Sequence, residues 1–325
     1  MSELRWHPLR QEWVITATHR QERTFHPPPE YCPLCPTRPE GYPTEVPEPS
    51  YEIVVFENRF PSLLREPPTP AVAPTPFSPV QPAHGVCEVV LYTPEHDTTL
   101  AELPLTRIEQ LIDVWRDRYA DLAARPEVQY VFIFENKGRE IGVTLSHPHG
   151  QIYAYPFIPP ALERELDAMR RHHQATGGNL LLEILQHELD DGRRIVQRID
   201  GWVSFVPFFA RYPYEVYLVP EVPRRDLLDL TEDELAGLAR ILKDTLLRYD
   251  CLWGFSMPYV MAQHPRPCDG AEHGYWQFHI EFYPPYRTRN KLKYLAGSES
   301  GAGVFINDTL PEETAQALRA VPVAL

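Results

Sequence analysis

Hydrophobic and polar residues along the chain follow two periods, and the order in which these periods occur repeats once. Two stretches carry apolar residues at intervals of three and four, one beginning at Thr106-x-x-Glu109 and the other at Thr231-x-x-Glu234. Such intervals place apolar side chains on one face of a helix. Threonine followed three residues later by glutamate is typical of a capping box, which closes the first helical turn. We therefore predict one amphipathic helix in each half of the chain.

Short apolar runs flank both predicted helices and indicate strands, because they are rich in aromatic and β-branched residues. The same order of runs and one long helix occurs twice. This order predicts an internal duplication, with a mostly antiparallel sheet and a packed helix in each half. We divide the halves into residues 1–175 and 176–325 and expect them to form one continuous α+β structure. The predicted strands cover residues 12–15, 51–58, 87–92, 130–134, 152–157, 202–207, 216–220, 257–262 and 276–285.

Residues 67–82 interrupt this pattern with seven prolines. Proline fixes its own φ angle and has no backbone N–H, so a segment this rich in proline forms neither a helix nor an inner strand. We predict an extended or partly disordered excursion between two strands.

The composition is that of a globular, acidic protein. The chain has 325 residues, of which 43% are hydrophobic and 23% charged, enough to bury a sizeable core. Its net charge of −14 disfavours a nucleic-acid binder, because neutralising phosphates needs a basic face. A phosphorylated small molecule is compatible with a few focused arginines and lysines. We found no apolar run of about 18 residues, so we expect no membrane insertion.

Five cysteines, an odd number, include the pair Cys32-x-x-Cys35 between prolines. An odd count in a chain of this size argues against a disulfide framework. A tight Cys-x-x-Cys turn suits a tetrahedral metal ion, although a redox pair, or a pair that binds nothing, fits the spacing as well. We favour metal binding in a reducing compartment and therefore expect a cytoplasmic protein.

Residues 146–151 read Ser-His-Pro-His-Gly-Gln and carry the strongest candidate chemistry. In an extended backbone, side chains two residues apart point to one face, so His147, His149 and Gln151 can converge. A neutral imidazole is a good nucleophile near pH 7. Gly150, which lacks a side chain, leaves room for a phosphate to approach. The simpler alternative is a pair of surface or metal-binding histidines.

Residues 134–138 read Phe-Glu-Asn-Lys-Gly, and together with residues 146–151 they resemble the galactose-1-phosphate uridylyltransferase family of the histidine-triad superfamily. The resemblance covers most of the chain and implies a duplicated histidine-triad-like fold in a homodimer. It also implies that UMP passes between UDP-glucose and galactose-1-phosphate. In this ping-pong reaction, His149 would carry the uridylyl group and Gln151 would donate to the phosphate oxygens.

The resemblance further implies a set of substrate-binding residues. Arg20 and Arg23 match arginines that the family donates across a dimer interface, whereas Lys293 and Glu299 match a loop that covers the hexose. Without the resemblance, the arginines would be taken for a solvated surface, and the loop for a polar connection. Asn58 in particular is equally typical of a turn. The remaining substrate contacts implied are Asn58, Asn136, Thr144 and Gln151.

Two metal sites follow from the same resemblance. A structural zinc site would have two cysteine and two histidine ligands and no open position. A second site, for iron or zinc, would have one glutamate and three histidines in the family, but here Glu281 replaces the last histidine. A hydrogen-bonded cluster without metal is the alternative for this second site. The implied ligands are Cys32, Cys35, His96 and His147 for zinc, and Glu165, His264, His279 and Glu281 for the second metal.

Two departures from the family pattern leave the hexose specificity open. Before His147 the family often has Cys-Ser-Asn-Pro, whereas residues 143–146 read Val-Thr-Leu-Ser, which keeps a hydroxyl but loses the thiol. The segment after Glu299 is rich in glycine and offers no match for a further sugar contact. The rival interpretations are a nucleotide-sugar phosphorylase or adenylyltransferase of the same superfamily, and a non-catalytic zinc-binding module.

Overall fold

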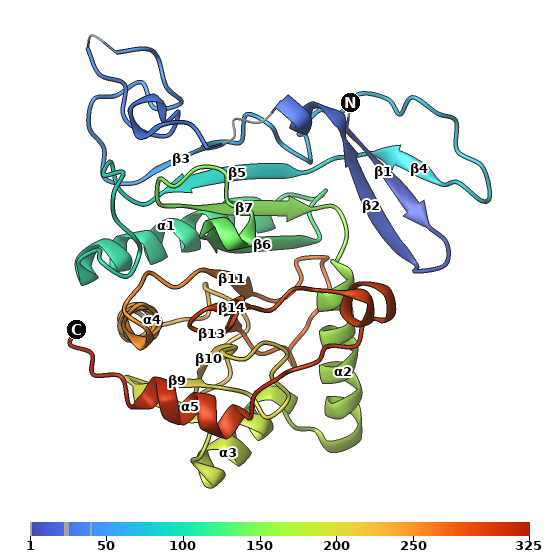
Figure 1. Cartoon of the computed structure of the whole chain (residues 1–325). Helices are drawn as coiled ribbons and strands as arrows, with labels where there is room; N and C mark the ends of the chain where they lie inside the picture. The colour runs from blue at the N-terminus through green and yellow to red at the C-terminus, as the bar shows by residue number, and fades with distance from the viewer. Residues whose placement is uncertain (1, 23–25, 40) are drawn as a thin grey trace.

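The computed structural model describes residues 2–22, 26–39 and 41–325. Its centre is a nine-stranded sheet in which all neighbouring strands are antiparallel (Figure 1). The order of strands across this sheet is β3 (Val54–Glu57), β5 (Val86–Leu91), β7 (His149–Tyr155), β6 (Tyr130–Lys137), β11 (Tyr259–His264), β12 (His279–Tyr283), β10 (Val216–Pro220), β9 (Trp202–Phe205) and β8 (Ile195–Ile199).

The order of elements confirms the predicted duplication. The first half contains β5, a helix, β6 and β7, and the second half contains β10, a helix, β11 and β12. In both halves the third strand lies between the first two, giving β5-β7-β6 and β10-β12-β11. The halves join where β6 pairs with β11, with Phe134 opposite Ala262 and Lys137 opposite Tyr259. A single sheet therefore runs through both halves, and the fold is the α+β arrangement expected from the sequence.

The two repeated helices, α1 (Leu105–Ala123) and α4 (Glu232–Leu252), pack against one face of this sheet and against each other. The predicted capping box of α4 is confirmed, with Thr231 and Glu234 each accepting from the other's backbone N–H. The predicted box of α1 is wrong, because this helix begins at Leu105 and has no side-chain cap. Pro104 holds an extended φ of −60° and ψ of 149° directly before the helix, so Thr106 lies inside the first turn.

The other face of the second half is covered by α2 (Pro160–Thr176) and α3 (Leu180–Asp191). Leu162 and Met169 of α2, together with Leu181 and Leu185 of α3, are buried against β6, β9 and β10. A short C-terminal helix, α5 (Pro311–Arg319), packs against β8 and α4. Glu165 of α2 is thereby held over the sheet.

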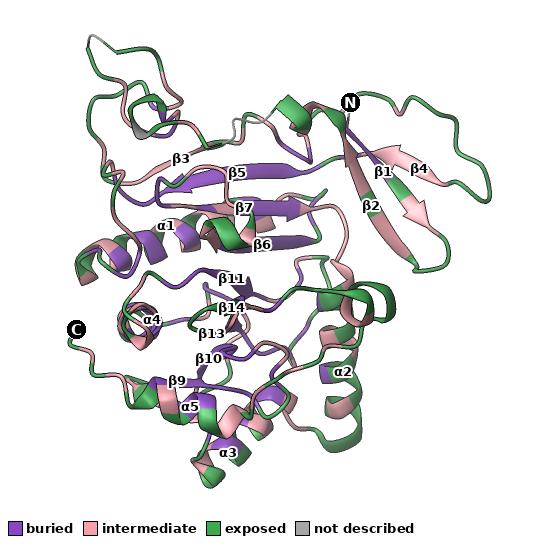
Figure 2. Ribbon diagram, viewed as in Figure 1, coloured by how far each residue is buried: buried purple, intermediate pink, exposed green. Residues whose placement is uncertain are grey.

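A small sheet stands beside the first half and consists of β2 (Glu12–Ala17), β1 (Ser2–His7) and β4 (Val80–Pro82). Strand β1 was not predicted. The proline-rich segment 67–82 is an irregular excursion, as predicted, and its end pairs with β1. Figure 2 shows β5 buried throughout, whereas β2 and β4 are only partly covered. The remaining strands, β13 (Tyr286–Thr288) and β14 (Lys291–Leu292), form a separate hairpin.

Within the residues described, none of the helices combines the length with the apolar composition required to cross a membrane.

Candidate active site and metal sites

His149 is the first residue of β7 and lies between two neighbouring strands, opposite Leu91 of β5. Its Nδ1 is 2.7 Å from the carbonyl oxygen of His147. Because a carbonyl can only accept, Nδ1 carries the proton and the lone pair of Nε2 is free. Burial lowers the pKa of His149 from its usual value, which favours the neutral imidazole. The segment thus presents a neutral ring whose tautomer is fixed by the backbone.

Two cavities meet at His149. One, of about 220 Å³, extends along β7 past Gln151 and Tyr153, and the other, of about 280 Å³, extends past His147 toward Ser256. Cavities that combine apolar walls with converging polar groups are typical of small-molecule sites. Both are lined by the same four residues, namely Asn136, Thr144, Leu145 and His149.

The smaller cavity contains several of the predicted substrate residues. Gln151 lies on the same face of β7 as His149, and its Oε1 accepts from Tyr153 at 3.3 Å. Asn58 closes a turn through its Oδ1, which accepts from the Phe60 N–H at 2.9 Å, and it also lines the cavity. Arg20 donates from Nη1 to the Phe60 carbonyl at 2.8 Å. The structure therefore brings Arg20, Asn58, Asn136, Thr144 and Gln151 to the cavity of their own chain. For Arg20 this differs from the position across a dimer interface that the resemblance implies, because its guanidinium is held by the Phe60 carbonyl of the same chain.

Two of the other predicted substrate residues are not brought to His149 within the described part of this chain. Arg23 lies outside the described residues. Lys293 and Glu299 line neither cavity and instead pair with each other, with Nζ 3.1 Å from Oε1. The side chains of both are nearly buried, and Lys293 also donates to the Ile306 carbonyl. This ion pair holds together the loop that precedes α5.

Gly150 has a different role from the one predicted. A Cβ at this position would lie 2.2 Å from the hydroxyl oxygen of Tyr92 and 3.2 Å from the Phe134 carbonyl. Tyr92 is fully buried, and its hydroxyl donates to Glu135 at 3.4 Å. Because neighbouring residues of a strand face opposite sides of the sheet, the missing side chain leaves room for Tyr92 rather than for a ligand.

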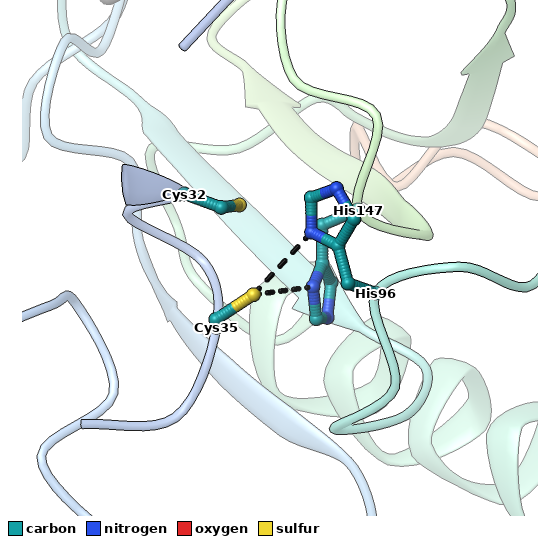
Figure 3. Close-up of side chains that lie close together, drawn as sticks. All are labelled: Cys32, Cys35, His96 and His147. Carbon is teal, nitrogen blue, oxygen red and sulfur yellow. Dashed lines mark hydrogen bonds between the residues drawn. The ribbon is translucent and has the colours of Figure 1, made fainter. Parts of the chain in front are cut away.

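The four predicted zinc ligands come together although they are far apart in sequence (Figure 3). Cys32, Cys35, His96 and His147 each offer a ligand atom, and these atoms all lie within 4.8 Å of one another. Cys35 Sγ is 3.3 Å from His96 Nδ1 and 3.5 Å from His147 Nδ1. Sulfur and nitrogen ligands of a tetrahedral zinc ion are about 3.5 Å apart, given ordinary metal–ligand bond lengths. The donor set and its spacing therefore fit zinc.

Outer contacts orient both zinc-site histidines. His147 donates from Nε2 to the Thr93 carbonyl at 2.8 Å, and His96 places its Nε2 3.1 Å from Ser146 Oγ. Each ring thereby keeps Nδ1 for the metal, an arrangement common among ligating histidines. Burial lowers the pKa of His147 to about 4, and burial beside Cys32 raises the pKa of Cys35 to about 12. A bound cation would reverse the second effect, because zinc binds the thiolate.

The second predicted cluster also forms, but its members are not equivalent. Glu165, His264 and His279 have ligand atoms within 4.8 Å of one another, and Glu281 lies beside this set. His264 Nδ1 is 2.9 Å from Glu165 Oε2, and His279 donates from Nδ1 to the Gln277 carbonyl at 2.9 Å. His279 is thus left with a free Nε2, 3.3 Å from Glu281 Oε1. One carboxylate and two imidazoles at this spacing fit iron or zinc.

Several residues around these sites were missed by sequence reasoning. Tyr51, whose hydroxyl is 3.1 Å from His147 Nε2, and Tyr92 behind Gly150 carry no local signal that distinguishes them from core tyrosines. Arg211 contacts Glu281 at 3.1 Å and lies 70 residues away from it in sequence. No motif or periodicity links such pairs, so only the folded chain reveals them.

Comparison with known proteins gives matches along the whole chain. Models of the N-terminal and C-terminal domains of galactose-1-phosphate uridyl transferase match residues 1–159 and 165–324. The first match ends directly before α2, and the second begins inside this helix. The predicted division at residue 175 lies near the end of α2 and stays a prediction. Galactose-1-phosphate uridylyltransferases from Thermotoga maritima and Streptomyces lividans are 40% and 37% identical to the chain. The alignments cover 100% of this chain and of the first relative, and 98% of this chain and 87% of the second.

A solved uridylyltransferase structure superposes with a TM-score of 0.88 at 36% identity, covering 98% of each chain. Sequence and structure therefore agree over nearly the full length of the molecule. The chain belongs to the galactose-1-phosphate uridylyltransferase family.

Proposed function

We propose that this protein transfers UMP between UDP-glucose and galactose-1-phosphate through a uridylyl group on His149. The observation that carries the proposal is the His149 ring itself. Its Nδ1 is bound to the His147 carbonyl at 2.7 Å, and the ring borders both cavities. A nitrogen with a fixed, available lone pair at such a junction is suited to attack phosphorus.

In the first step, Nε2 forms a bond to the α-phosphorus of UDP-glucose while the bond to the bridging oxygen breaks, releasing glucose-1-phosphate. In the second step, a phosphate oxygen of galactose-1-phosphate attacks the same phosphorus and His149 leaves. Each step exchanges one phosphorus bond for another, and the leaving phosphate needs no proton to depart. Gln151 lies two residues from His149 on the same cavity and would donate to the phosphoryl oxygens as charge develops.

The cavity along β7 offers the groups that a nucleoside diphosphate requires. Arg20 supplies a guanidinium for phosphate, and Asn58, Asn136 and Thr144 supply amide and hydroxyl groups. Lys293 and Glu299 lie away from His149 of their own chain, so they would reach a hexose only in a second copy. This placement supports the homodimer.

The metal sites support the fold around this chemistry. We assign zinc to Cys32, Cys35, His96 and His147, where four ligands leave no position for a reacting group. His147 would then fix the backbone carbonyl that sets the tautomer of His149. We assign iron or zinc to the cluster of Glu165, His264 and His279, with Glu281 beside it. Thiolate ligands of this kind need reduced cysteines, which supports a cytoplasmic location.

The test is the intact mass of the protein after brief exposure to UDP-glucose in the absence of an acceptor. The wild type should gain one uridylyl group, which galactose-1-phosphate should then remove. His149→Ala should gain none, whereas His187→Ala, which removes an exposed histidine of α3, should behave like the wild type. Labelling of His149→Ala would contradict the proposal. An adduct with ADP-glucose in place of UDP-glucose would favour an adenylyltransferase or phosphorylase.

A further inference from the structure

Glu281 places a second carboxylate directly beside the second metal cluster. Its side chain is only 1% exposed, and Glu165 already contributes one negative charge to the same group. By the resemblance, members of the family have a histidine at this position, and a neutral histidine would carry no charge. A buried carboxylate is costly unless a positive group or several donors compensate it.

Arg211 provides this compensation from the loop before β10. Its Nη2 is 3.1 Å from Glu281 Oε2 and 2.9 Å from the hydroxyl of Tyr283. The guanidinium also lies over the rings of Tyr283 and Phe305, 5.0 Å and 5.6 Å from their centroids. An arginine held by stacking and by fixed acceptors loses little further freedom when it pairs with a carboxylate.

A second buried carboxylate anchors the backbone of Arg211. Glu215 Oε2 accepts from the backbone N–H of Arg211 and of Tyr212 at 2.6 Å and 2.9 Å. The other oxygen of Glu215 is 3.5 Å from Arg211 Nε, which is longer than the contact with Glu281. The guanidinium is therefore fixed in place and has Glu281 as its nearest charged partner.

The two oxygens of Glu281 face different groups. Oε1 is 3.3 Å from His279 Nε2, on the side of the cluster. Oε2 is 3.8 Å from His264 Nε2 and is the atom bound by Arg211. One oxygen thus borders the ligand atoms while the other is held by the guanidinium.

We propose that Arg211 and Glu281 act as one unit of the second metal site, in which Arg211 balances the charge that the carboxylate brings. One glutamate with three histidines carries a single negative charge. Glu165 and Glu281 carry two, and Arg211 returns the sum of these three groups to one. Glu215 keeps its two backbone N–H donors whichever of the two residues is replaced. A carboxylate can therefore occupy this position because an arginine lies behind it. The inference rests on the second metal site assigned above and is independent of uridylyl transfer.

The pairing makes opposite predictions for the two single variants. Glu281→His leaves Arg211 beside an uncharged ligand, so its positive charge opposes a divalent cation, and binding should weaken at least tenfold. Arg211→Gln leaves both carboxylates uncompensated, so binding should strengthen at least tenfold. The double variant restores the single negative charge and should bind within about threefold of the wild type, because the two effects oppose each other.

The measurement is the titration with Mn²⁺ of chelator-treated protein to which one equivalent of Zn²⁺ per chain has been returned, an amount that the thiolate site takes up first. Binding is followed by the electron paramagnetic resonance signal of the free ion. Manganese favours oxygen and nitrogen over thiolate ligands, so it reports on this cluster rather than on the cysteine site. Arg198→Gln is the matched control. Arg198 lies on the edge strand β8 and pairs with Glu221, so its replacement should not affect binding. Where Glu281→His does not fold by circular dichroism, Glu281→Gln takes its place, with the same direction of change.

Weaker binding in Glu281→His that Arg211→Gln reverses would support the pair. Unchanged binding in the single variants, or no recovery in the double variant, would overturn it. A wild type that binds no Mn²⁺ would overturn both the pair and the second metal site. The mass increase on His149 is measured on the same samples, so a failure of the uridylyltransferase assignment is seen separately.

Discussion

At the scale of single residues, a backbone carbonyl two positions earlier determines what a histidine can do. His149 begins β7 and donates from Nδ1 to His147, whereas His279 begins β12 and donates from Nδ1 to Gln277. The two strands occupy the same place in the duplicated halves. One free Nε2 borders the cavities and the other faces a metal cluster. The duplication has therefore kept the local geometry of the histidine while its proposed chemistry differs.

Gly150→Ala tests the contact behind the nucleophile. The added methyl group would lie 2.2 Å from the Tyr92 hydroxyl, so the strand or the tyrosine must shift. We expect the free energy of unfolding to fall by about 1–3 kcal/mol, as for other overpacked sites, and uridylyl transfer to fall with it. Tyr92→Phe removes the clashing oxygen and should recover part of the stability of Gly150→Ala in urea titrations. Additive effects of the two changes would contradict this contact.

Glu135→Gln tests a buried carboxyl at the border of the larger cavity. Burial raises the pKa of Glu135 to about 7, so the folded chain binds this proton between about pH 4.5 and 7 and the unfolded chain does not. The stability that Glu135 contributes is therefore present below pH 4.5 and is lost as the pH rises through 7. As the pH rises over this interval, the free energy of unfolding of Glu135→Gln should increase relative to that of the wild type by up to about 3 kcal/mol. If the urea midpoints of variant and wild type differ by the same amount at pH 5, 6 and 7.5, the raised pKa of Glu135 is contradicted.

At the scale of elements, the pattern predicted the order and type of the strands and long helices, but not every boundary. Residues 216–220 form β10 as predicted, and β7 begins at His149, within the segment 146–151 that was expected to be extended and before the apolar run 152–157. The predicted strand over residues 276–285 is shortened to His279–Tyr283 in β12, because the ends of a strand depend on its pairing with neighbouring strands. Strand β1 was missed because it begins with the polar residues Ser2 and Glu3, which do not follow the apolar pattern of a buried strand. Both are nevertheless buried in the small sheet.

The same limit applies to the candidate site. His149 and Gln151 could be grouped by their spacing along one strand. The zinc ligands could not, because His96 and His147 follow the cysteines at long and irregular intervals, and only the resemblance selected them. Arg211 and Tyr92 could not be found by either route, since their partners are set by tertiary packing.

The helices α1 and α4 begin differently, because only α4 has a capping box, and this difference gives a matched pair of variants. Thr231→Ala removes a side chain that accepts from the Glu234 N–H, and it should cost about 1 kcal/mol of stability. Thr106→Ala makes the same chemical change at the corresponding position of α1, where Thr106 forms no cap. It should therefore change the urea midpoint by much less. Equal losses in both variants would show that the capping difference between α1 and α4 has no energetic effect.

At the scale of the whole molecule, the zinc ligands join segments that the large sheet does not hold. Cys32 and Cys35 lie in an irregular segment, His96 follows β5, and His147 precedes β7. The nine-stranded sheet and the helices α1 and α4 share a separate core in which these ligands take no part. Loss of zinc should therefore loosen the surroundings of the nucleophile while the sheet stays folded.

Cys32→Ser is the variant that tests this division, with Cys268→Ser as a control for the loss of a thiol outside the site. We expect Cys32→Ser to lower the zinc content and the melting temperature together. Hydrogen exchange, followed by mass spectrometry, should rise in the segments around Cys35, His96 and His147, and change little in β10, β12 and α4. The His147 carbonyl sets the tautomer of His149, so uridylyl transfer should fall even though the large sheet stays folded. Full zinc content in the variant would contradict the site, and a uniform rise in exchange would mean that zinc stabilises the entire fold.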